Sequence, residues 1–144
     1  MMGKRKSVHT KPTESTDDQC PIWIFQYIDR EGKFAFDTSR KDFQHNLFWT
    51  KMIEYSRMTW GTIKTQTHDA GKSKHHRLDY DEKILTRDAM KCIERKIKPE
   101  NRDAIFSFAL NNLVRIIGVR IGAEFRVMWY DPNHEFSKSI KKHT

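Results

Sequence analysis

Two kinds of side chain in the second half of this chain could act together on a phosphate ester. Imidazoles come from a basic loop, at His75 and His76, and from the sequence WYDPNH, which ends at His134. Histidine can exchange protons near neutral pH because the pKa of its free side chain is about 6.5. Guanidinium groups bind phosphate oxygens and stabilise negative charge that develops on them. The candidates for that role are Arg115, Arg120 and Arg126.

These residue types suit metal-independent cleavage of RNA. The reaction needs a base for the 2′-hydroxyl proton, an acid for the leaving oxygen and cations around the phosphorane. We predict that His134 works with His75 or His76, and that Asp131 orients a histidine. The alternative for Asp131 and His134 is structural, with Asp131 capping its turn and His134 forming a local bond. The predicted nucleic-acid contacts are Arg115, Arg120, Arg126, Lys72, Lys74 and Arg77.

No metal ion or cofactor is expected. The spacing of His68, His75 and His76 matches no standard zinc pattern, and no cysteine or carboxylate cluster completes it. The two cysteines, Cys20 and Cys92, are far apart and cannot build a disulfide framework. A reducing, cytoplasmic setting is the simplest expectation.

Charge and hydropathy point to polyanions and away from membranes. The formal net charge of +8 favours attraction to nucleic acid. No apolar run approaches the ~18 residues of a membrane span. The basic cluster at 4–6 is not followed by an apolar segment, so we expect no secretory signal.

The expected fold is α+β, with a mainly antiparallel sheet packed against two to three helices. We predict one domain over 21–136, a disordered basic tail at 1–20 and a basic tail at 137–144. An N-terminal hairpin is expected from 22–27 and 33–37, with a turn at 29–32 that ends at Gly32. A meander of three strands is expected at 104–110, 113–120 and 124–130.

Apolar spacing predicts three helices. The first covers 41–56, with Thr38 or Ser39 as its cap and Asp42 in its first turn. A short helix at 60–66 follows Thr59, and a third begins after Thr86 and ends before Pro99. The segment between the second and third helices, 67–82, is predicted to be a long loop, and loops of this kind often carry functional residues.

Strand alternation assigns faces to the meander. Arg115, Ile117 and Val119 share one face of the middle strand, and Gly118 indicates a bulge or a close approach by another group. In the last strand Phe125, Val127 and Trp129 are expected on one face and Arg126 and Met128 on the other. The turn that follows, Asp-Pro-Asn-His, fits a type I turn.

Several of these features together resemble a family of short bacterial proteins without an assigned activity. The shared features are MTW at 58–60, a loop histidine at 75 or 76, RIIGVR at 115–120 and WYDPNH at 129–134. The resemblance covers most of 22–136, and the chain departs from the family pattern at Ala109 and Ile117. It implies no particular reaction.

A looser resemblance is architectural. Helices followed by a three-stranded meander that carries arginines are similar to the RelE/ParE group of toxin proteins. Members of that group with ribonuclease activity cleave mRNA at the ribosome with basic and polar residues on the open sheet face. The resemblance implies a toxin or defence protein whose partner is RNA, in a ribosome-associated setting, or a small antitoxin-like protein.

Two other interpretations remain open from the residues. The protein could be a non-catalytic module of a mobile element that binds nucleic acid or a partner protein. It could also be a stable domain whose charge has no binding role. An enzyme should bring His75 or His76, His134 and the arginines into one cleft, whereas a binding module would spread the basic residues over a flat face.

Overall fold

The structure is a computed structural model that describes residues 15–68 and 71–138. Five strands form one open sheet in the order β1-β5-β4-β3-β2. The strands are β1 (Ile22–Ile24), β2 (His76–Arg77), β3 (Ile105–Ala109), β4 (Arg115–Ile121) and β5 (Glu124–Asp131). The helices are α2 (His45–Ser56), α3 (Trp60–Thr65), α4 (Arg87–Lys96) and the 3-10 helix η2 (Pro99–Ala104). The predicted α+β class and the antiparallel meander of β3, β4 and β5 are confirmed.

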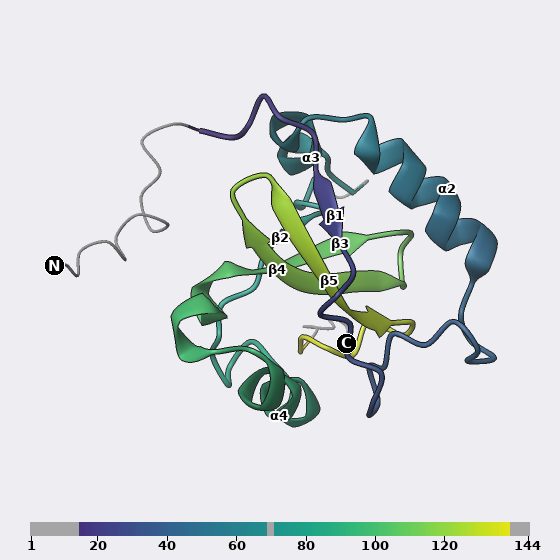
Figure 1. The fold of residues 1–144 in the computed structure, drawn as a ribbon, viewed down its shortest axis with the longest axis vertical. Helices are drawn as coiled ribbons and strands as arrows, with labels where there is room; N and C mark the ends of the chain where they lie inside the picture. The colour runs from purple at the N-terminus through teal and green to yellow at the C-terminus, as the bar shows by residue number, and fades with distance from the viewer. Residues whose placement is uncertain (1–14, 69–70, 139–144) are drawn as a thin grey trace, which may run out of the picture.

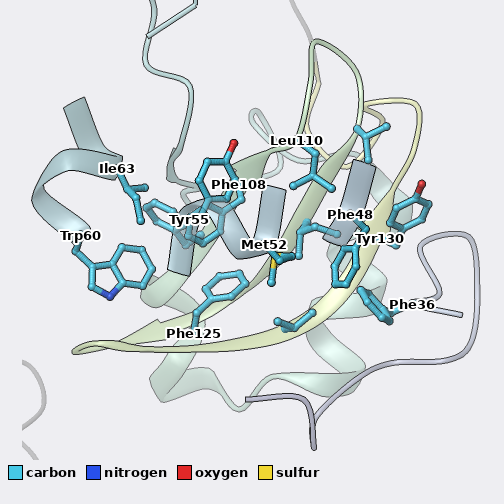
Figure 2. Packing of buried hydrophobic residues seen from close by; sticks show 14 of the residues in the cluster. Phe36, Phe48, Met52, Tyr55, Trp60, Ile63, Phe108, Leu110, Phe125 and Tyr130 are labelled. Atoms are coloured by element: carbon cyan, nitrogen blue, oxygen red, sulfur yellow. The ribbon is translucent and has the colours of Figure 1, made fainter. Parts of the chain in front are cut away.

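Helices cover both faces of the sheet (Figure 1). On one face Phe48, Met52 and Tyr55 of α2 and Trp60 of α3 pack against β3, β4 and β5 in a core rich in aromatic rings (Figure 2). On the other face α4 packs onto β4 and β5 in a second, more aliphatic core. Each fully buried side chain of this kind contributes about 1.5–3 kcal/mol. The sheet is therefore anchored from both sides, and its two edges are the strands β1 and β2.

A β-bulge interrupts the pairing of β4 with β5. Ile117 pairs with Trp129 and Gly118 pairs with Val127, so Met128 is the extra residue of β5. An added residue reverses the alternation beyond it. Trp129 consequently lies in the α4-side core, and its expected position beside Phe125 and Val127 was wrong.

Gly118 lies against the backbone of β5 with no room for a side chain. A Cβ placed there would lie 1.8 Å from the carbonyl oxygen of Arg126. The prediction that this glycine marks a bulge or a close approach is confirmed, and both apply.

The predicted N-terminal hairpin was wrong. β1 pairs in parallel with β5, with Ile22 opposite Glu124, and the segment 33–37 forms only an isolated bridge from Ala35 to Trp129. The cause lies at Asp29, a buried carboxylate that accepts from Trp129 Nε1 at 2.8 Å and from Arg95 Nη2 at 2.8 Å. These bonds hold the chain across β5, so it does not return along β1.

Helix starts were predicted with mixed success. Thr59 and Thr86 cap α3 and α4, accepting from the N–H groups of Thr62 and Ala89. The predicted start of the first helix was wrong, because α2 begins at His45 after Gln44, which makes no side-chain cap. The Asp42 carboxylate instead binds Arg40 at 2.8 Å, before the helix begins.

The packed region extends slightly beyond 21–136 at both ends. The carbonyl of Gln19 accepts from Trp60 N–H at 2.8 Å, and Asp17 forms an ion pair with Lys64 at 2.9 Å. At the other end Ser137 bridges to Leu85. The remainder of the two predicted tails, 1–14 and 139–144, lies outside the described residues.

Candidate functional site

A pocket of about 310 Å³ lies where the open end of the meander meets the loop before β2, on the α4 side of the sheet. We call it the basic pocket. Among the described residues that line it, none is acidic. Its lining consists of His68, Lys72, Ser73, Lys74, His76, Leu78, Ser107, Arg115, His134 and Ser137. The two lysines come from one segment, Arg115 from a second and His134 from a third, so folding brings together residues that are scattered in the sequence.

The two neighbouring histidines of the loop lie on opposite faces of the sheet. β2 pairs with β3 so that His76 stands opposite Ser107, and both line the basic pocket. Successive side chains of a strand point to opposite faces. His75 accordingly enters the aromatic core, where its ring lies 4.8 Å from that of Tyr55 and 5.3 Å from that of Phe108.

His75 has both ring nitrogens bonded inside that core. Nδ1 accepts from the N–H of Ala109 at 3.1 Å, so Nε2 carries the hydrogen and donates to Gln66 Oε1 at 2.8 Å. Burial lowers the pKa of His75 to about 3. This side chain stays neutral and inaccessible, so its placement does not support the predicted catalytic role for His75.

His76 is exposed, and its ring has a defined tautomer. Nδ1 lies 3.2 Å from the carbonyl oxygen of Arg77, which can only accept, so Nδ1 carries the hydrogen. In the neutral ring Nε2 is then unprotonated. In this tautomer Nε2 is the nitrogen through which the neutral ring would act as a general base.

His134 reaches the basic pocket from the turn after β5. The buried carboxylate of Asp131 holds this turn, accepting from the N–H groups of Glu135 at 2.9 Å and Phe136 at 2.8 Å. His134 has a φ of 55°, in the left-handed region that few residues with a side chain adopt. Thr86 fixes the turn to the start of α4 by donating from its hydroxyl to the carbonyl of Glu135 at 3.0 Å.

Asp131 itself does not line the basic pocket. Its carboxylate is fully buried, and burial raises its pKa, opposed by the two bonds from backbone N–H groups. The turn-capping role that the sequence left open for Asp131 is the one its contacts describe.

Arg115 forms the inner wall of the basic pocket. Its side chain is 7% exposed, and its Nη1 donates to the carbonyls of Asn111 at 2.8 Å and Val114 at 3.2 Å. Burial lowers the pKa of Arg115, and the nearby Asp131 carboxylate opposes that shift. A guanidinium remains protonated in proteins. A cation held this far from water acts more strongly on an anion than one on the surface.

Lys72 and Lys74 come from a tight loop whose ends are joined. Thr67 bridges to Ser73, the N–H of His68 donates to the carbonyl of Lys72 at 2.9 Å, and the N–H of Lys74 donates to the carbonyl of Gln66 at 3.0 Å. Residues 69–70 lie outside the described residues. The predicted loop at 67–82 thus contains β2 and a closed turn that presents both lysines to the basic pocket.

Three predicted nucleic-acid contacts lie elsewhere. Arg120 is on the opposite face, with its guanidinium 4.0 Å from the Trp60 ring centroid and a 2.9 Å bond to Thr16. Arg126 lies near the end of α4, with its guanidinium 4.6 Å from the ring of Tyr27. Arg77 follows His76 on the edge strand and pairs with Asp79 at 2.8 Å. These three arginines do not join the basic pocket.

Five residues that line the basic pocket were not predicted as site residues, namely His68, Ser73, Leu78, Ser107 and Ser137. His68 was considered only as a metal ligand, and Ser107 and Ser137 were not singled out. The alternation of side chains along β3 places Ser107 on the same face as Ile105, and this could be read from the sequence. That Ser107 lies opposite His76 follows only from the pairing of β3 with the short strand β2. Within residues 15–68 and 71–138, no group of three or more His, Cys, Asp or Glu side chains is placed to hold a metal ion.

The comparisons with known proteins leave the site to be interpreted from its chemistry. No protein-family model, curated protein or solved structure matches this chain. In the described part of the chain, no helix has the length and apolar character needed to cross a membrane. The arrangement of the basic pocket, with three imidazoles beside a buried guanidinium and two lysines, is suited to an anion that undergoes proton transfer.

Proposed function

We propose that the protein acts on RNA, as a metal-independent endoribonuclease whose reacting phosphate binds in the basic pocket. The observation that carries this proposal is the presence of His76, His134 and Arg115 around one pocket. This supports a catalytic cleft only in part, because Arg120 and Arg126 lie outside the pocket.

Each side chain has a chemical role in the proposal. His76 Nε2 takes the proton of the 2′-hydroxyl, whose oxygen then attacks phosphorus. His134, protonated, gives its proton to the 5′-oxygen as the bond from phosphorus to that oxygen breaks. The products are a 2′,3′-cyclic phosphate and a free 5′-hydroxyl. Arg115 and Lys72 stabilise the negative charge that grows on the phosphorane.

The proposal is tested with purified protein and a single-stranded RNA of mixed sequence in the presence of EDTA. We expect cleavage of RNA and no cleavage of the same sequence as DNA, since DNA has no 2′-hydroxyl. His134→Ala and His76→Ala should each lower the rate by about 100-fold or more, because acid–base catalysis contributes about 10²–10⁴. His45→Ala is the matched control, since His45 lies on α2 and outside the basic pocket. Full activity of His134→Ala would refute the catalytic proposal.

A toxin or defence role in the cytoplasm is the finer form of this proposal. Expression of the wild type should arrest growth, expression of His134→Ala should not, and a small antitoxin-like protein encoded nearby should relieve the arrest. Equal growth arrest by wild type and His134→Ala, at equal protein levels, would show that toxicity does not depend on the basic pocket.

The second candidate is a non-catalytic binding module of a mobile element. It is favoured by the arginines outside the basic pocket, since Arg126 beside Tyr27 and Arg120 beside Trp60 place cations on other surfaces. RNA binding that weakens with salt, without any cleavage, is the result that would favour the module.

A further inference from the structure

A second hollow, of about 650 Å³, lies on the other side of the edge strand β2. We call it the edge hollow. Ser73 and His76 line both the edge hollow and the basic pocket. β2 has only two residues and is the last strand of the sheet. A ligand in the basic pocket can therefore continue around this edge into the edge hollow.

The two hollows differ in charge. Of the cations that line the edge hollow, Lys64 pairs with Asp17 at 2.9 Å, Arg120 lies 3.9 Å from the same carboxylate, and Arg77 pairs with Asp79 at 2.8 Å. A further carboxylate, Asp103, also lines it. Carboxylates repel a phosphate, so the edge hollow is suited to an uncharged polar group, whereas the basic pocket is suited to the phosphate itself.

The edge hollow has the features of a base-binding site. Its volume lies in the range of ~300–1,000 Å³ that is usual for small-molecule sites. Phe106 and Ala104 provide an apolar part of its wall. Asp103 is exposed at its rim, and an ionised carboxylate only accepts hydrogen bonds. Among the bases, adenine, cytosine and guanine carry an amino group that can donate to it, and uracil does not.

We propose that the edge hollow binds the base next to the phosphate held in the basic pocket, and that Asp103 selects bases with an exocyclic amino group. This inference rests on the proposed function for the position of the phosphate. The strand must bend around β2 to occupy both hollows. A single strand can bend in this way, whereas a duplex is stiff over ~150 base pairs.

The test measures binding with the full chain carrying His134→Ala, so that cleavage does not interfere. Fluorescence anisotropy of labelled RNA pentamers should show that oligo-C and oligo-A bind at least about fivefold more tightly than oligo-U, as expected for one selective base contact. Adding Asp103→Ala should reduce this preference to below about twofold, because the acceptor is lost. The matched control is Glu82→Ala, an exposed carboxylate outside both hollows, which should keep the preference.

Equal affinity for the three pentamers, or a preference that survives Asp103→Ala, would overturn the base assignment. A blunt RNA duplex that binds as tightly as the single strands would overturn the bent-strand geometry. If the wild type binds RNA selectively but does not cleave it, the proposed catalysis is refuted and the base assignment stands. If it cleaves RNA without base selection, the base assignment is refuted and the proposed catalysis stands. Failure to bind any RNA would refute both the proposed function and the base assignment. Binding of only a peptide along β2 would refute them as well.

Discussion

His75 and His76 are adjacent in the chain but lie on opposite faces of the sheet, one inside the aromatic core and one in the basic pocket. His76 begins β2 and His75 is the residue just before it, and successive side chains along an extended chain point to opposite faces. Their contributions to stability and to activity should therefore be separable by mutation.

His75→Ala should destabilise the protein by about 2–4 kcal/mol, because it opens a cavity and leaves the buried N–H of Ala109 without its acceptor. The measurement is chemical denaturation followed by circular dichroism. His76→Ala, at an exposed site, should change the free energy of unfolding by no more than about 0.5 kcal/mol. Equal stability of the two variants would contradict the assigned faces.

The low pKa of His75 predicts a pH dependence of stability. The folded state keeps His75 neutral down to about pH 3, whereas the unfolded chain binds a proton near pH 6.5. The unfolded state thus holds more protons between these values, and the contribution of His75 to stability should fall by roughly 1.4 kcal/mol per pH unit as the pH drops from about 6.5 toward 3. The stability difference between wild type and His75→Gln, measured across this range, isolates the effect from other titrating groups. A difference that does not vary with pH would show that His75 is not buried as a neutral ring.

Gly118→Ala should be strongly destabilising, by about 3 kcal/mol or more, because its Cβ would overlap the carbonyl of Arg126 and force β4 away from β5. Thermal or chemical denaturation gives the value. Gly71→Ala is the comparison, since a Cβ there meets nothing within 4 Å and the cost, at a φ of 85°, should be limited to about 1–2 kcal/mol of backbone strain. A Gly118→Ala protein as stable as Gly71→Ala would mean that the bulge does not form.

Lys72→Ala should weaken RNA binding and reduce its salt dependence. Each phosphate neutralised on a single strand contributes about 0.7 to the slope of log K against log salt concentration. Removal of Lys72, which lines the basic pocket, should lower the slope by about that amount. Lys41→Ala, an exposed lysine outside the basic pocket, should leave the slope unchanged. An equal change in the salt slope for both variants would indicate that RNA is attracted only by the net charge of the protein.

The local elements were the part that sequence patterns could predict. Thr59 and Thr86 cap their helices, and the meander appears where β-branched and aromatic residues alternate, because these signals depend only on neighbours a few residues away. The close approach at Gly118 was also predictable, since a glycine inside a strand commonly marks a bulge or a neighbouring backbone that leaves no room for a side chain.

Pairing partners and faces were decided by the tertiary structure. β1 joined β5 in parallel because Asp29 is held by Trp129 and Arg95, which are far from it in sequence. Met128 became the extra residue of a bulge, and this reversed the face of Trp129.

The candidate site shows the same division. The sequence by itself determined the kinds of residue present, namely histidines in a basic loop, a histidine after a proline turn and arginines on the strands. Only the tertiary structure decided that His76, His134 and Arg115 share a pocket while His75, Arg120 and Arg126 do not. The physical reason is that residue type is local, whereas the face and neighbours of a side chain follow from strand register and burial, which depend on the whole chain.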